Sequence, residues 1–95
     1  MEPEVLWSLL RDLARRAGVV VRLENLGGGE DHASGGGLCR VGGRMVAFVD
    51  RRLSPLGRAR QLGQALNRLE LEGVYLKPAL RQFLAGLEGG PAEED

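Results

Sequence analysis

The sequence predicts an α+β fold in which three helices accompany a three-stranded, mainly antiparallel sheet. Three observations lead to this prediction. A Gly-Gly pair at 42–43 separates two apolar runs and is typical of a tight hairpin between strands at 38–42 and 44–50. A β-branched run at 19–24 supplies a third strand. Apolar residues spaced three or four positions apart predict helices at about 3–17, 55–69 and 78–88.

The first helix is indicated by both its ends and its apolar stripe. Pro3 suits the first helical turn, and Gly18 is placed where a left-handed residue ends a helix. Trp7 lies near the edge of the stripe, and we expect its ring to pack partly against the core. The stripe itself consists of Leu6, Leu9, Leu10, Leu13 and Ala17.

The hairpin determines which residues share a face of the sheet. With Gly42–Gly43 as the turn, Cys39 pairs with Val46, and the rest of the register follows. Both faces are then apolar, so each needs cover from a helix, a loop or a second copy of the chain. We expect Cys39 to be a buried small hydrophobe on a core face. One face carries Cys39, Val41, Val46 and Phe48, and the other carries Leu38, Met45, Ala47 and Val49.

The segment at 27–37 is rich in glycine, with six glycines among its eleven residues. High backbone entropy and little apolar surface predict a mobile loop. The loop lacks the endings of phosphate-binding motifs but contains chemically competent side chains: Glu30, Asp31, His32 and Ser34. Flanking glycines do not hold such groups rigidly, so a solvated loop is favoured over a ligand contact or a catalytic site.

The second half of the chain is predicted to be helical with one irregular connection. Ser54 is a good N-cap, and Pro55 fits the first position of the second helix. Residues 70–77 mix apolar with charged side chains and indicate an extended connector or a short strand. Pro78 then opens the last helix. We assign residues 1–88 to one globular domain and 89–95 to a disordered acidic tail.

Composition limits the partners that the chain can attract. Apolar residues make up 43% and charged residues 27% of the chain, and the formal net charge is zero, so nothing draws it as a whole to nucleic acid or anionic lipid. Glu2 and Glu4 stand where a signal peptide would be positive, and no apolar run is long enough to span a membrane. We therefore expect a cytoplasmic protein without a membrane partner. The single cysteine excludes an internal disulfide.

A local basic cluster follows the hairpin and consists of Arg51, Arg52, Arg58 and Arg60. Asp50 stands beside it, and no aromatic residues are interleaved with the arginines. This pattern favours a solvated, partly ion-paired surface over a nucleic-acid site.

The order of elements from Leu9 to Leu69 resembles the minimal core of the ImmA/IrrE-type zincin-like proteins. The segment LARRAGVVVRLE corresponds to a helix and a strand, MVAFVD to a strand that ends in Asp, and RRLSP to the start of the family's metal-binding helix. The family's His-Glu-x-x-His motif falls on residues 64–68, which are Gln-Ala-Leu-Asn-Arg here. The resemblance thus implies a retained shape without the zinc chemistry. The alternative is that common α-β-β-α elements coincide.

Taken together, these patterns favour a non-enzymatic interaction module that forms homo-oligomers or binds a protein partner through an apolar sheet face. The interface candidates are Leu38, Met45, Ala47 and Val49. One alternative is a metal-dependent or acid/base hydrolase centred on the loop residues Glu30, Asp31, His32 and Ser34. Another is a nucleic-acid-binding module that uses the Arg51–Arg60 cluster. No cofactor and no metal site is predicted.

Overall fold

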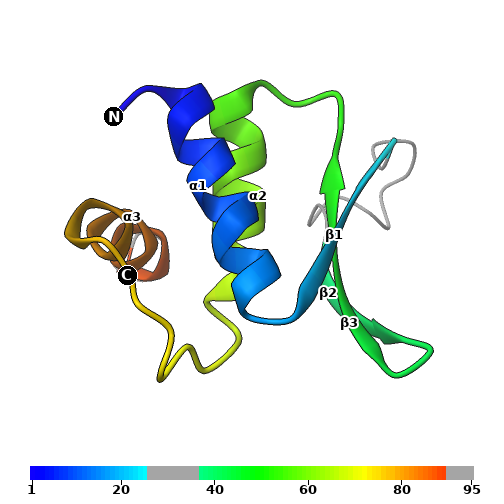
Figure 1. Ribbon diagram of the computed structural model, residues 1–95. Helices are drawn as coiled ribbons and strands as arrows, with labels where there is room; N and C mark the ends of the chain where they lie inside the picture. The colour runs from blue at the N-terminus through cyan, green and yellow to red at the C-terminus, as the bar shows by residue number, and fades with distance from the viewer. Residues whose placement is uncertain (26–36, 90–95) are drawn as a thin grey trace.

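The computed structural model places its helices on one side of a three-stranded sheet (Figure 1). The structure describes residues 1–25 and 37–89. Within them it confirms the predicted α+β class, while the predictions for the loop at 27–36 and the tail at 90–95 lie outside the described residues. The helices are α1 (Pro3–Arg16), α2 (Pro55–Leu66) and α3 (Pro78–Gly89), and the strands are β1 (Val19–Glu24), β2 (Gly37–Val41) and β3 (Arg44–Asp50).

The strand order is β1-β3-β2, so β3 is central. β2 runs antiparallel to β3 in the predicted register, with Cys39 opposite Val46. β1 runs parallel to β3, with Val19 opposite Met45. The sheet is therefore mixed, which corrects the prediction of a mainly antiparallel one. The reason is that the chain reverses direction twice between β1 and β3, and β3 then lies between the two earlier strands.

The hairpin turn consists of the two predicted glycines. Gly42 has a φ of 60° and Gly43 a φ of 82°, a region that residues with a Cβ rarely enter. Since Gly42 belongs to the turn, β2 ends at Val41, one residue earlier than predicted. The turn chemistry thus fixes the pairing of β2 with β3.

The elements form three layers. α1 and α2 lie side by side against one face of the sheet, and α3 packs on the far side of that helix pair (Figure 1). The core lies mainly between α1, α2 and the sheet, where Leu10, Leu13 and Leu62 are 0% exposed. Trp7 is 7% exposed, which confirms that its ring packs against the core. The arrangement leaves the opposite face of the sheet without a helix from the described residues.

The predicted helix starts are confirmed. The ends of α1 and α3 each differ from the prediction by one residue, at Arg16 and Gly89, and the end of α2 differs by three. The Ser54 Oγ accepts the Gly57 backbone N–H at 3.1 Å and caps α2. α2 ends at Leu66 rather than at 69, because the next N–H groups bond three residues back, Arg68 to Ala65 and Leu69 to Leu66. Residues 70–77 form a connector without a strand.

Candidate interaction surface

The four predicted interface residues lie on the face of the sheet that α1 and α2 cover. Ala47 and Val49 are 0% exposed, and Leu38 and Met45 pack partly buried against the same core. A partner could reach Ala47 or Val49 only if the helices moved away. The structure therefore corrects the choice of face. The hairpin pattern is apolar on both sides, and the side that meets the helices depends on how α1 and α2 dock.

The opposite side of the sheet, which we call the helix-free face, carries the other apolar set. The register places Val20, Val46 and Cys39 side by side across the three strands. Phe48 and Val41 extend this row along the strands. Cys39 is exposed, and Val41 is 48% exposed, so the prediction of a buried thiol was wrong. No described helix packs on this face, but Val46 at its centre is 5% exposed and Val20 and Phe48 are half-buried, so Cys39 and Val41 are its most accessible apolar residues.

Charged side chains of both signs surround the helix-free face. The Arg22 Nη2 pairs with the Glu24 Oε2 at 3.0 Å, and the Arg22 guanidinium also lies 5.9 Å from the Phe48 ring centroid. Arg44 begins β3 on the same side of the sheet. A face with an apolar centre and a mixed-charge rim has the anatomy of a protein interface.

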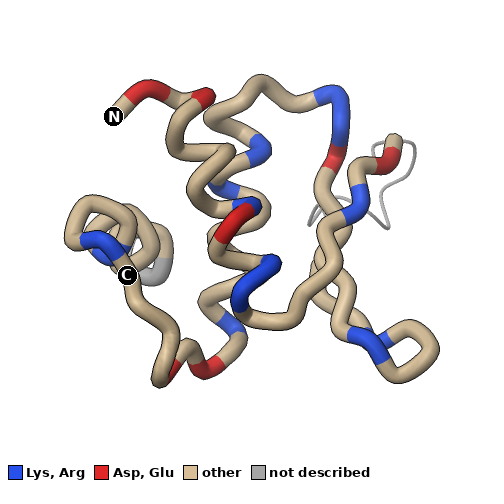
Figure 2. The backbone as a smooth tube through the Cα atoms, in the orientation of Figure 1, with Lys and Arg blue, Asp and Glu red and all other residues tan. Residues whose placement is uncertain are grey.

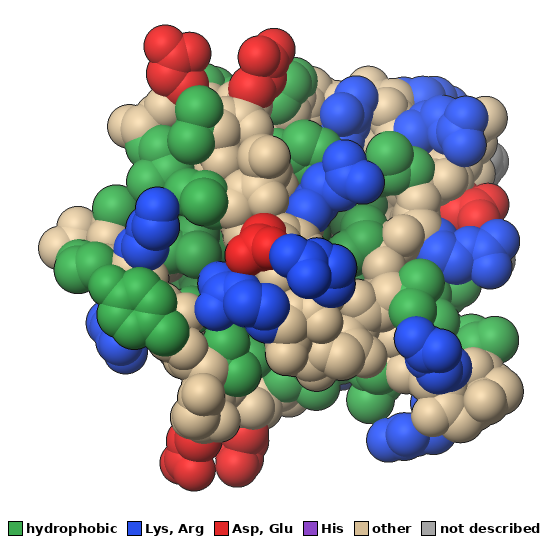
Figure 3. All heavy atoms as spheres, in the orientation of Figure 1, with side chains coloured by type: hydrophobic (Ala, Val, Ile, Leu, Met, Phe, Trp, Pro, Cys, Tyr) green, Lys and Arg blue, Asp and Glu red, His purple; other side chains and the backbone are tan. Residues whose placement is uncertain are grey.

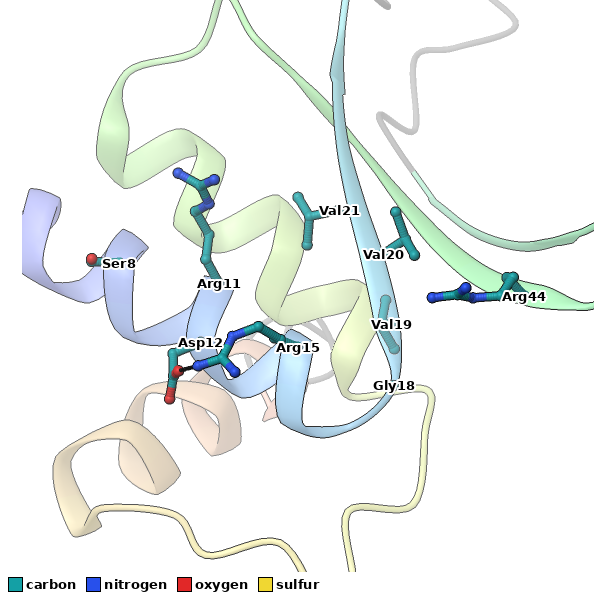
Figure 4. A pocket seen from close by; sticks show the side chains of 9 residues that line it. All are labelled: Ser8, Arg11, Asp12, Arg15, Gly18, Val19, Val20, Val21 and Arg44. Carbon is teal, nitrogen blue, oxygen red and sulfur yellow. Dashed lines mark hydrogen bonds and ion pairs between the residues drawn. The ribbon is translucent and has the colours of Figure 1, made fainter.

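A second surface feature lies between α1 and the edge of the sheet, and we call it the α1–β1 groove. It has a volume of about 490 Å³. Figure 4 shows the side chains that line it. Basic side chains gather around one acidic side chain over the middle of this side of the molecule (Figure 3). The groove is lined by Ser8, Arg11, Asp12 and Arg15 of α1, by Gly18, Val19, Val20 and Val21, and by Arg44 of β3.

The acidic group in the groove is already neutralised. Asp12 pairs with Arg15 and with the Arg16 Nε, the latter at 2.9 Å. Arg11 lies over the Trp7 ring, 5.6 Å from its centroid. Neither Arg11 nor Arg44 has a carboxylate partner among the described residues. The groove therefore offers two guanidinium groups that are free to pair with an anionic ligand.

Acid titration should show the pairing of Asp12. Its hydrogen bond with Arg16, supported by Arg15, lowers the pKa of Asp12 below its ordinary value of 3.8. The pairing therefore stabilises the fold above the unfolded-state pKa, and this contribution is lost as the pH falls through the lowered native pKa. We expect an NMR titration of the Asp12 carboxyl carbon to have a midpoint below 3.8, and Arg16→Gln to move it back toward 3.8. Arg60→Gln, on exposed α2 surface, should leave it unchanged, and a native midpoint at or above 3.8 would contradict the pairing.

The predicted basic cluster at Arg51–Arg60 is largely occupied with the protein's own groups. The Arg51 Nη2 donates to the Leu23 carbonyl at 3.1 Å, and Arg52 pairs with Asp50. The Arg58 Nε donates to the Leu53 carbonyl at 3.1 Å. These contacts hold the turn between β3 and α2 in place. The basic positions also spread over several elements (Figure 2), a distribution unlike one continuous stripe.

The predicted loop candidates Glu30, Asp31, His32 and Ser34 lie outside the described residues. Within residues 1–25 and 37–89, no group of three His, Cys, Asp or Glu side chains is arranged to hold a metal ion. Positions 64–68, where the suggested resemblance would place the zincin motif, lie at the end of α2 and just after it. There Ala65 and Leu66 are buried, and the Asn67 Nδ2 donates to the Leu84 carbonyl at 2.9 Å, which ties α2 to α3.

Comparisons of the chain with protein-family models, with curated proteins and with solved structures found no match. In the described part of the chain, no helix is long and apolar enough to cross a membrane. The two surfaces described above are therefore the basis for a functional argument. The sequence alone did not predict the α1–β1 groove. On an isolated amphipathic helix, Arg11 and Arg15 belong to the solvent-exposed face, and only the structure shows that the edge strand β1 lies beside them.

Proposed function

We propose that the protein is a non-enzymatic interaction module that pairs with a second copy of itself through the helix-free face. The observation that carries this proposal is the row of Val20, Val46 and Cys39, extended by Phe48 and Val41, on a side of the sheet where no described helix packs. A half-covered antiparallel or mixed sheet normally presents polar residues to water on its open side. A partner that packs on an apolar open side would bury its exposed apolar surface.

The rim supports a second copy over a partner of one charge sign. Arg22, Glu24 and Arg44 place both signs along the same face. In a two-fold dimer each surface meets its own copy, so a mixed rim can be self-complementary, with Arg opposite Glu. A partner of strongly acidic or strongly basic character would meet charges of both signs along this rim.

The size of the face sets the expected affinity. Three strands about 4.8 Å apart, with about six residues each at about 3.3 Å per residue, present roughly 300 Å². Stable interfaces bury about 800 Å² on each partner. The face alone is smaller than that, so we expect a reversible dimer with a dissociation constant in the micromolar range.

Self-association can be tested with two matched variants. Val41 and Val5 are 48% and 50% exposed, Val41 on the helix-free face and Val5 on α1. We expect Val41→Glu to raise the dimer dissociation constant about tenfold or more, because it places on the apolar face a carboxylate that would lose hydration when the two copies pair. Val5→Glu should leave the constant unchanged. Analytical ultracentrifugation over a broad micromolar concentration range measures both.

Cys39 gives an independent readout, since it is the single thiol in the chain and lies exposed on the same face. If the face pairs, the rate of Cys39 modification by a thiol reagent should fall as protein concentration rises, and Val41→Glu should remove this protection. A monomer throughout the concentration range, or equal behaviour of Val41→Glu and Val5→Glu, would overturn the proposal.

A further inference from the structure

The α1–β1 groove lies beside a strand rather than above it. Its lining includes Val19, Val20 and Val21, three consecutive residues of β1. Successive side chains of a strand point to opposite faces of the sheet. A hollow that all three residues line must therefore extend along the backbone edge of the strand.

That edge has backbone groups available for pairing. Among the described residues, β1 pairs with β3 alone. Alternate N–H and C=O groups of an edge strand turn outward, away from its one neighbour, and form a template for another extended chain. The groove runs along about four residues, from Gly18 to Val21, or about 13 Å of strand.

Arginines stand on both sides of this edge. Arg11 and Arg15 project from α1 on the helix-covered side, whereas Arg44 extends toward Val19 and Val20 from β3 (Figure 4). Asp12 is neutralised by Arg15 and Arg16, so the lining has a net positive charge. A peptide strand along β1 would direct its side chains alternately toward α1 and toward Arg44, and carboxylates in either set would meet a guanidinium.

We propose that the α1–β1 groove binds an extended peptide segment that carries acidic side chains, by addition of a strand to the outer edge of β1. Main-chain hydrogen bonds to Val19–Val21 provide the general affinity, and pairing with Arg11 and Arg44 provides the selectivity for carboxylates. This site uses the outer edge of β1 rather than the surface of the three strands, and it shares Val20 and Arg44 with the helix-free face.

Other readings of the same groove give different outcomes. A phosphate or nucleic-acid backbone would use the arginines without the strand edge. Arginines that merely shield an edge strand from aggregation would bind no ligand at all. The proposal requires charge and backbone pairing together, and a test has to vary the two separately.

Three labelled octapeptides separate these contributions. The Thr-Glu peptide consists of two Thr-Glu-Glu-Thr repeats, which place glutamates on both faces of an added strand and supply every backbone N–H. The Thr-Gln peptide has Gln for each Glu and so removes the charge, and the Pro-Glu peptide has Pro for each Thr, which keeps the charge but removes N–H groups along both edges of the strand. In fluorescence anisotropy at low salt, we expect saturable micromolar binding of the Thr-Glu peptide. The dissociation constants of the other two peptides should be at least about tenfold higher.

Protein variants then locate the site. Arg44→Gln and Arg11→Gln should each weaken Thr-Glu binding about fivefold, since each removes one charge-assisted pair. Arg81→Gln, which removes an exposed arginine on α3, should not change it. In amide NMR spectra, the peptide should shift the signals of Val19–Val21 and not those of Cys39–Val41 on the other sheet edge.

The result is independent of self-association, because the titration can be repeated on Cys39→Asp, which places a charge on the helix-free face opposite Val46 and outside the groove lining. Equal binding of the Pro-Glu peptide, equal weakening by Arg81→Gln, or competition by inorganic phosphate at a comparable concentration would overturn strand addition. If the folded protein shows no saturable binding of the Thr-Glu peptide, the proposal is also overturned. The arginines would then serve to protect the strand edge from aggregation.

Discussion

Val49→Asp is expected to unfold the protein. Val49 lies on the central strand, is 0% exposed and belongs to the core between the sheet and the helices. A carboxylate there would lose its hydration among the apolar side chains of the core, at a cost of several kcal/mol. A domain of 95 residues has a total stability of about 5 to 14 kcal/mol, so a single change of this kind removes most of it.

The matched control for this prediction is Val41→Asp on the helix-free face. Val41 is 48% exposed, so the new charge stays in water, and the expected loss is about 1 kcal/mol or less. Val49→Thr keeps the shape of valine and should cost about 1–3 kcal/mol, which keeps the effect measurable if the Asp variant does not fold. Urea unfolding followed by fluorescence of the single, buried Trp7 measures all three variants. Similar losses for Val49→Asp and Val41→Asp would mean that the sheet does not have one covered and one open face.

The elements that local chemistry determines were predictable from the sequence. Gly42 and Gly43 adopt positive φ values that a two-residue turn requires, so the register of β2 against β3 follows from the turn alone. Ser54 and Pro55 likewise define the start of α2 through capping and a fixed φ. In both cases the cause lies within a few residues of its effect.

The features that depend on distant residues were not predictable in the same way. Whether β1 pairs in a parallel or an antiparallel way depends on which strand of the hairpin it lies beside: it is parallel to β3, and in the same direction beside β2 it would have been antiparallel. For the same reason, Cys39 was predicted on the buried face and Val49 on the interface face. The structure shows Cys39 exposed and Val49 buried. An apolar pattern on two faces predicts that both are buried. Which face the helices bury depends on how α1 and α2 dock.

This ambiguity also hid the candidate sites. Arg11 and Arg15 are unremarkable on an isolated helix, and their relation to the strand edge arises from the tight turn at Gly18, where φ is 81°. That turn brings β1 back along α1 and places three valine residues beside the basic helix face. A glycine at the end of an amphipathic helix, followed at once by a β-branched run, is the sequence signal that could have pointed to the groove.

Gly63→Leu is expected to release α3 from α2. A Cβ atom at Gly63 would lie 2.6 Å from the Leu87 Cδ1 and 3.2 Å from the Leu84 Cδ2, so a leucine side chain cannot be accommodated without movement of α3. Displacement would also break the hydrogen bond between the Asn67 amide and the Leu84 carbonyl, which is 2.9 Å long. We expect a loss of about 3 kcal/mol, from overpacking and from lost cover over the buried Leu80 and Leu84.

The control for Gly63→Leu lies on α3 itself. A Cβ at Gly86 would meet no atom within 4 Å, and the position is exposed, so Gly86→Ala should gain about 0.5–1 kcal/mol from helix propensity. Because α3 packs on the side of the helix pair away from the sheet, its release should leave the pairing of β2 with β3 intact. Limited proteolysis should then cut Gly63→Leu within the connector at 70–77 faster than the wild type, while Gly86→Ala resists. Equal stability of the two variants in urea would show that α3 is not held by its close approach to Gly63.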